Sequence, residues 1–243
     1  MEPAQIIRTA MAQVAQLRTD AIDHPPLGAA VTSIKHFQSR RFAYTYADLA
    51  ASDQYQAATR FFLDELYSEA SYAERDAQFS GIAGALQSLL PKPALATAVA
   101  LAQLHALSEQ LDHAMGHAWL VGSASVDSDE TGRYIHAWRT VDRRSDRETQ
   151  LRIVLEIGTD LDRLTRFAGL RLILKMMRGP AHAAGLGALQ HFLELGFDTF
   201  AAMGQQKPGA RGFLEIVRAR ESRLIDLLFD AHFTTCHAEL FQQ

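Results

Sequence analysis

Apolar residues recur at spacings of three and four along almost the whole chain, and this period is the strongest constraint on its fold. Ile6, Ala10, Val14 and Leu17 follow it near the start. A helix of about 3.6 residues per turn places such residues on one face. No segment keeps a strand's alternation of apolar and polar residues, and no internal repeat is evident. The sequence therefore predicts an all-α protein.

Proline and glycine divide the periodic segments into about eight or nine helices. Breaks are predicted at 24–28, 91–93, 179–180 and 207–209. A kink or break is also predicted at Gly158, inside a long helical segment that runs from about residue 146 to residue 177. The lengths and the short connections suit a helical bundle.

The chain is long enough to bury a sizeable core, and we expect a single helical domain over residues 1–243. The segment 121–131 is small, polar and acidic, and it is predicted to be a flexible surface loop. Because it divides the chain almost in half, the alternative is that it marks a boundary between two subdomains.

Composition and charge exclude several functions. The net charge of −4 provides no basic surface for nucleic acid or an anionic membrane, so neither is expected as a partner. Residues 1–16 lack a basic segment followed by an apolar core, and no apolar run is long enough to span a bilayer. Cys236 is the single cysteine, which favours a reducing compartment. We expect a soluble cytoplasmic protein and leave its oligomeric state open.

The densest unusual stretch is 60–76, which has the sequence RFFLDELYSEASYAERD. Phe61 and Phe62 lie on a predicted helix that is apolar around more than half of its circumference, so this helix should be buried on several sides. Asp64 and Glu65 enter its last turn, where the helix dipole disfavours negative charge. A nearby cation should therefore compensate them.

The next helix provides that cation. The segment 71–74, Ser-Tyr-Ala-Glu, fits a capping box, and Arg75 follows in the first turn. We expect Arg75 to pair with Glu65 or Asp64, and Asp76 to lie favourably near the new helix N-terminus. The preferred interpretation is a structural hub that fixes a helix–helix corner; the alternative is a buried acid site with raised carboxylate pKa values. The hub comprises Phe61, Phe62, Asp64, Glu65, Tyr67, Arg75 and Asp76.

Five segments of the chain resemble the bacterial FFLEE-motif proteins, an all-helical family without an assigned activity. These are TYADLAASDQYQAATRFFLDELYS, AERDAQF, LHALSEQLD, GALQHFLELGFDTFAAM and FLEIVRARE. The resemblance covers roughly residues 40–230. In this chain Asp64 stands where the family usually has Glu. This difference suggests that the carboxylate group matters at this position more than the length of the side chain that carries it.

A stripe of polar residues at i+4 spacing, His105, Glu109, His113 and His117, follows one face of a long predicted helix. Glu109 and His113 are the candidate metal ligands, because residues at i and i+4 can bind one ion. The full stripe spans about 18 Å, too far for one ion. Di-iron bundles also use Glu-x-x-His motifs, which the chain lacks. The stripe lies opposite the leucine face of its helix, so we prefer a partly solvated polar flank.

The arginine-rich segment 139–152 could bind phosphate or an acidic partner. Acidic residues interleave with its arginines, so we prefer a solvated helix face neutralised by local pairs.

Two hypotheses for the function remain. The preferred one is a non-enzymatic binding or adaptor protein for a protein partner or an apolar small molecule, because no catalytic motif is complete. The alternative is a helical-bundle, metal-dependent oxidoreductase of the di-iron type, which requires Glu109, His113 and Glu65 to converge. No catalytic residue and no cofactor are assigned.

Overall fold

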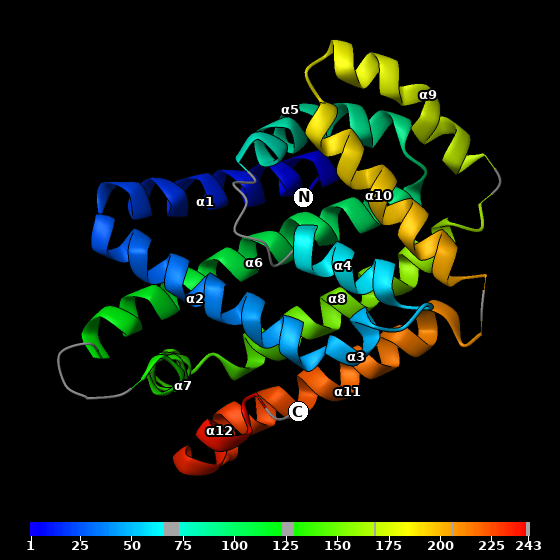
Figure 1. The fold of residues 1–243 in the computed structure, drawn as a ribbon. Helices are drawn as coiled ribbons and strands as arrows, with labels where there is room; N and C mark the ends of the chain where they lie inside the picture. The colour runs from blue at the N-terminus through cyan, green and yellow to red at the C-terminus, as the bar shows by residue number, and fades with distance from the viewer. Residues whose placement is uncertain (66–72, 123–128, 168, 206, 242–243) are drawn as a thin grey trace.

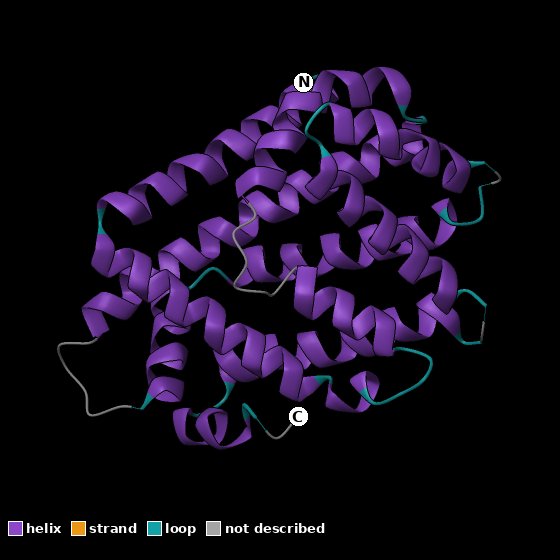
Figure 2. Ribbon diagram, turned by 45° about the horizontal axis from the view of Figure 1, so that its top comes forward, coloured by secondary structure: helices purple, strands orange, loops and turns teal. Residues whose placement is uncertain are grey.

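The protein is all-helical in the parts that the computed structural model describes, residues 1–65, 73–122, 129–167, 169–205 and 207–241. These parts hold twelve helices and no strand (Figure 2). The all-α prediction is confirmed, and the expected number of eight or nine helices is too low. The helices are α1 (Pro3–Asp23), α2 (Pro25–Thr45), α3 (Ala47–Ala50), α4 (Gln56–Glu65), α5 (Ala73–Leu89), α6 (Lys92–Gly122), α7 (Glu130–Val141), α8 (Arg144–Leu164), α9 (Leu170–Ala183), α10 (Gly187–Met203), α11 (Gly209–Asp230) and α12 (Phe233–Glu239).

The long segment predicted from 146 to 177 divides into α8 and α9. The division lies at Gly169, whose φ of +92° suits glycine and interrupts the helical backbone. The helix does not break at Gly158, because α8 continues through it. A Cβ at Gly158 would lie 2.5 Å from a Leu214 methyl carbon, so this glycine permits the close packing of α8 against α11.

The predicted helix end at 179–180 is wrong, since Pro180 lies within α9. A proline removes one backbone hydrogen bond from a helix interior. Residues 175–180 are exposed, so water can solvate the carbonyl group that loses its donor.

Helix α6 is the central element, and α1, α2, α7 and α8 all pack against it (Figure 1). Its Leu111 and Met115 side chains have no exposed surface. Three hydrophobic clusters adjoin it: one with α2, α7 and α11, one with α4, α8 and α10, and one with α1 and α5. A helix surrounded in this way must bury its polar side chains together with its apolar ones.

The connection from α6 to α7 contains the predicted flexible loop. Residues 123–128 lie outside the described chain, so the prediction of flexibility remains a prediction. Asp129 begins the part that follows, where its carboxylate accepts a hydrogen bond from the Gly132 N–H at 2.9 Å and caps α7. α7 then packs back against α6.

Within the described chain, no helix combines the length and the apolar character needed to cross a bilayer.

Candidate functional site

A cavity of about 180 Å³ lies beside α6 in the interior of the bundle. Residues from α1, α2, α4, α5, α7, α8, α10 and α11 complete its wall. Apolar residues such as Phe62, Leu104 and Val154 form much of the lining, and charged groups are distributed among them. The charged lining residues are Lys35, Arg41, Glu65, Arg75, Asp76, His105, Glu109, Asp112, Arg147 and Glu221.

Many of the polar lining residues lie toward one of two ends of the cavity along α6. The α5 end contains Glu65, Arg75, Asp76 and His105, and the α7 end contains Lys35, Gln38, Glu109, Asp112, Trp138 and Arg147. His105 and Asp112 represent the two ends on α6 itself. They are seven residues apart, which corresponds to about 10 Å along the helix axis.

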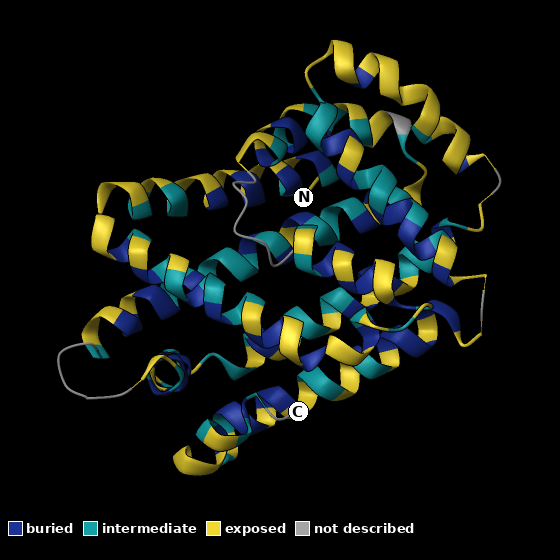
Figure 3. Cartoon of the chain, viewed as in Figure 1, coloured by how far each residue is buried: buried dark blue, intermediate teal, exposed yellow. Residues whose placement is uncertain are grey.

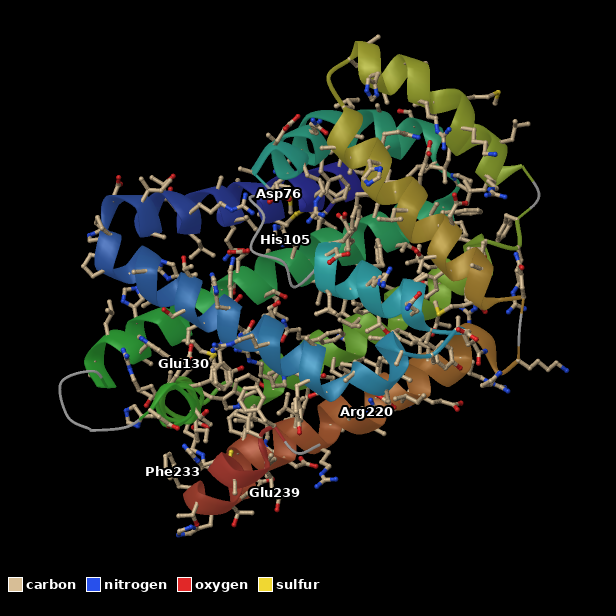
Figure 4. The ribbon with its side chains drawn as sticks, viewed as in Figure 1. Asp76, His105, Glu130, Arg220, Phe233 and Glu239 are labelled. Atoms are coloured by element: carbon tan, nitrogen blue, oxygen red, sulfur yellow. The ribbon has the colours of Figure 1, made fainter. Side chains whose placement is uncertain are left out.

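At the α5 end, Asp76 is held by two partners. Its Oδ2 lies 2.8 Å from His105 Nε2 and accepts a hydrogen bond from Arg18 Nη2 at 2.6 Å (Figure 4). Burial alone would raise the pKa of Asp76, but the hydrogen bond and charge of His105 and the charge of Arg18 outweigh it and hold the pKa below its usual value. Asp76 is therefore an ionised carboxylate that orients the His105 ring. Asp76 also lies in the first turn of α5, as the sequence predicted.

An Asp–His pair at a cavity can support proton transfer when a nucleophile or substrate reaches the histidine. Ser108 lies one turn after His105 and also lines the cavity. Its hydroxyl accepts a hydrogen bond from Gln150 Nε2 at 2.7 Å, and no Ser108–His105 bond is found in the described chain. The geometry therefore provides an oriented imidazole without an assembled Ser-His-Asp triad.

Arg75 provides the cation expected of the structural hub. Its Nη1 lies 3.3 Å from Glu65 Oε2 and from the Glu65 backbone carbonyl, so the predicted Arg75–Glu65 pair is confirmed. The guanidinium also lies 4.4 Å from the centroid of the Phe192 ring, within the range of a cation–π contact. Asp64 is exposed.

The two phenylalanines of the hub have different neighbours. Phe61 stacks on Phe192 with ring centroids 5.7 Å apart. Phe62 lines the cavity and packs near Phe42 and Phe213. Tyr67 lies in the segment 66–72, which is outside the described chain. The predicted capping box at 71–74 begins in the same segment.

A third ion pair lies on the α11 side of the cavity. Arg41 Nη1 donates to Glu221 Oε1 at 2.6 Å, and the Tyr46 hydroxyl donates to the same oxygen at 2.9 Å. The Arg41 side chain is only 6% exposed. This arginine therefore depends on Glu221 for compensation of its charge.

At the α7 end, α2 and α6 exchange two polar contacts. Lys35 Nζ donates to Glu109 Oε1 at 2.6 Å, and Gln38 Nε2 donates to Asp112 Oδ1 at 2.9 Å. Burial raises the pKa of Asp112 above its usual value, although the charges of Lys35 and Arg147 and the Gln38 bond act in the opposite direction. Burial thus makes the ionised form of Asp112 less favourable than it would be in water.

Trp138 and Arg147 complete this end. The Arg147 guanidinium lies 4.1 Å from the centroid of the Trp138 indole, and it donates to Met115 Sδ at 3.0 Å and to Gln150 Oε1 at 3.2 Å. The indole Nε1 of Trp138 is buried and has no hydrogen-bond acceptor in the described chain. Beside them, burial raises the pKa of Tyr134 to about 12.

The candidate metal ligands Glu109 and His113 are not brought together with a third one. The described chain holds no group of three histidine, cysteine, aspartate or glutamate side chains that could share an ion. Glu109 lines the cavity and accepts from Lys35. The His113 and His117 rings contact each other edge to face, with centroids 4.9 Å apart. Burial, followed by the charge of His117, lowers the pKa of His113.

Two sets of polar residues lie deeper than their sequence pattern suggested. His105 and Glu109 line the cavity, because other helices cover α6 on the side that was interpreted as a partly solvated flank. Arg147 is 7% exposed, whereas Arg143 and Arg152 make the local pairs expected of a solvated face, with Asp146 and Glu156 respectively. No signal in a single sequence separates Arg147 from the arginines around it.

A family model described as a domain of unknown function, DUF8198, matches residues 17–235. No curated protein matches the chain, and no solved structure does. The matched range contains Arg18 and all of the residues that line the cavity except Met11. The match spans most of the helical bundle and nearly the whole site, and the chain therefore belongs to the DUF8198 family.

Proposed function

We propose that this protein binds a small molecule in the cavity beside α6, and that the ligand combines an apolar body with at least one polar group. One observation carries this proposal: ion-paired and polar side chains from separate helices converge on a cavity in the interior of the bundle.

Stability alone does not account for such an arrangement. Removing charges from water costs several kcal/mol per ion, and well-packed apolar residues often stabilise a core as well as a buried ion pair does. Ligand sites, in contrast, typically combine apolar walls with a few placed polar groups. The lining of this cavity has that composition.

The charged lining residues restrict the class of small molecule that the cavity can bind. An apolar molecule would desolvate the pairs at both ends of the cavity without replacing their hydrogen bonds. A ligand with a polar group at one end fits the lining better. The metal-dependent alternative has less support, because Glu109 accepts from Lys35 and His113 is absent from the lining. The FFLEE resemblance, the bacterial origin and the cytoplasmic location remain predictions.

Native mass spectrometry of the untagged protein, beside a denatured spectrum of the same sample, tests the proposal. A retained ligand should add mass that disappears on denaturation. Val154→Phe should reduce the retained fraction, because Val154 lines the cavity and the larger ring would fill it. Val99→Phe is the matched control, since Val99 is a half-buried helical valine outside the cavity. A ligand that both variants retain equally would contradict this site.

A further inference from the structure

The α7 end of the cavity contains a buried hydrogen-bond donor that has no partner in the described chain. Trp138 is 6% exposed and lines the cavity, and its Nε1 lacks an acceptor in the described chain. An unsatisfied buried donor costs about 1–3 kcal/mol, and such groups in native proteins usually have a water or ligand partner. An indole nitrogen only donates, so that partner must be an acceptor atom.

Arg147 adds positive charge at the same place. Its guanidinium carbon lies over the Trp138 ring, 4.1 Å from the ring centroid. A planar guanidinium has five N–H donors in a geometry that matches an oxyanion. A ligand oxygen that accepts from Trp138 would therefore lie close to this charge.

The charges around Asp112 discriminate between an anionic and a cationic ligand. Besides burial, which raises the pKa of Asp112, the charges of Lys35 and Arg147 act to lower this pKa. Glu109 acts to raise it, with a smaller effect than either cation. Lys35 is paired with Glu109, and no cation lies within salt-bridge distance of the Asp112 carboxyl group in the described chain. A ligand ammonium group would face Lys35 and Arg147, as well as a tryptophan N–H that cannot accept. A ligand carboxylate would be attracted by both cations, and a protonated Asp112 would donate to it.

We propose that the α7 end binds the carboxylate of a small apolar acid, which accepts hydrogen bonds from Trp138 Nε1 and Arg147 and lies beside Asp112. This inference rests on the proposed function and specifies its ligand class. The apolar body lies along Leu104, Leu151 and Val154, toward the α5 end.

The cavity volume limits the size of this acid. An apolar cavity of roughly 150 Å³ holds benzene, and this cavity measures about 180 Å³. A single aromatic ring or a short aliphatic chain with a carboxylate is the appropriate class. Benzoate is therefore a suitable probe, with benzyl alcohol and benzylamine as neutral and cationic probes of similar size.

Calorimetric titration of the protein, checked for a bare chain mass, tests the charge preference. Benzoate should bind at least tenfold more tightly than benzyl alcohol, and benzylamine should bind most weakly. Equal or tighter binding of benzylamine would overturn the inference. The two proposals can fail separately. If Val154→Phe expels a co-purified ligand but benzoate binds no more tightly than benzyl alcohol, the cavity still binds a ligand. Only the carboxylate assignment is then wrong.

Two tryptophans provide a matched pair of variants. Trp138→Phe keeps a ring at the cavity and removes the N–H, so benzoate affinity should fall about tenfold, the factor that corresponds to one hydrogen bond. Trp119→Phe is the control: Trp119 is also 6% exposed and also lies beneath an arginine, Arg133, but it is outside the lining. Equal losses in both variants would contradict a direct contact.

The Asp112→Asn variant tests whether Asp112 donates a hydrogen bond to benzoate or has only a structural role. Asparagine keeps the shape and always provides a donor, so benzoate should still bind. In the unsubstituted protein, benzoate affinity should fall as the pH rises and Asp112 ionises, and this dependence should disappear in the variant. The other titratable or charged groups near Asp112 and Tyr134 are Lys35, Glu109, Arg147, and Arg41 with its partner Glu221. A pH dependence that survives the substitution would assign the proton to one of them.

Discussion

Helices α6 and α9 reverse the usual relation between side-chain type and environment. α6 lies in the centre of the bundle and turns His105, Glu109 and Asp112 toward the cavity. α9 packs on α10 at the periphery and exposes Leu172, Ile173 and Met176 (Figure 3). Charged side chains of α6 thus line the interior, where apolar side chains are the usual choice. Apolar side chains of α9 are exposed to water, where polar side chains are the usual choice.

The two helices differ in how their surroundings constrain them. Each buried charge at α6 has a specific partner contributed by another helix, as Lys35 of α2 does for Glu109. α9 attaches through a narrow stripe that includes the buried Leu170 and Ala181. Changes near α6 should therefore have large and directional effects, whereas equivalent changes on α9 should have small ones. The following substitutions compare the two environments, from the largest expected effect to the smallest.

Arg41→Met should destabilise the protein by about 3–5 kcal/mol, because it leaves Glu221 without its cation in a buried site. Arg171→Met on α9 removes an exposed pair with Asp198 and should cost no more than about 1 kcal/mol. Urea denaturation followed by circular dichroism measures both. Similar losses would show that the Arg41 pair is solvated and that the comparison is wrong.

Asp76→Asn should cost about 2 kcal/mol near pH 7, since Asp76 accepts bonds from the charged Arg18 and from His105. The pKa of Asp76 is lowered in the folded state. Its contribution to stability is therefore complete above the unfolded pKa of about 3.9 and is lost as the pH falls through the lower folded-state pKa. Denaturation curves from pH 7 to pH 2 should show the difference between the two proteins shrinking toward acid. A constant difference would contradict an ionised Asp76.

Gly158→Ala and Gly179→Ala should have opposite signs. Alanine is worth up to about 1 kcal/mol over glycine in a helix. In α8 the added Cβ would meet the buried Leu214 at 2.5 Å, so Gly158→Ala should destabilise by about 1–2 kcal/mol. In α9 nothing lies within 4 Å of a Cβ at Gly179, so that variant should be slightly more stable. Thermal unfolding measures both, and two stabilised variants would show that α8 can move away from α11.

The features predicted correctly from the sequence are local ones. The helical period depends on neighbours three and four residues apart, and the Arg75–Glu65 pair spans one short break between two helices. The Asp76–His105 contact could not be predicted in this way, because it joins residues 29 apart and depends on how α5 lies against α6. The role of Gly158 could not be predicted for the same reason. The sequence shows that residue 158 has no side chain, but only the packing of α8 against α11 shows that Leu214 fills the space that a side chain would need.

The cavity depends both on a local sequence pattern and on the packing of distant helices. His105, Glu109 and Asp112 were visible as a polar face of a long helix, but a surface flank and a polar interior have the same sequence period. The difference lies in α2, α5 and α7, which cover that face with Lys35, Asp76 and Trp138.

Met176→Ala should change stability by no more than about 0.5 kcal/mol, because Met176 is 61% exposed on α9. Met115→Ala on α6 is the matched control, and it should cost about 2–5 kcal/mol since Met115 has no exposed surface. A loss above 1 kcal/mol for Met176→Ala would mean that α9 is covered in solution. Repeating the measurement over a range of protein concentrations then identifies the cover: a loss that grows with concentration indicates a second copy of the chain, and a constant loss indicates a contact within one molecule.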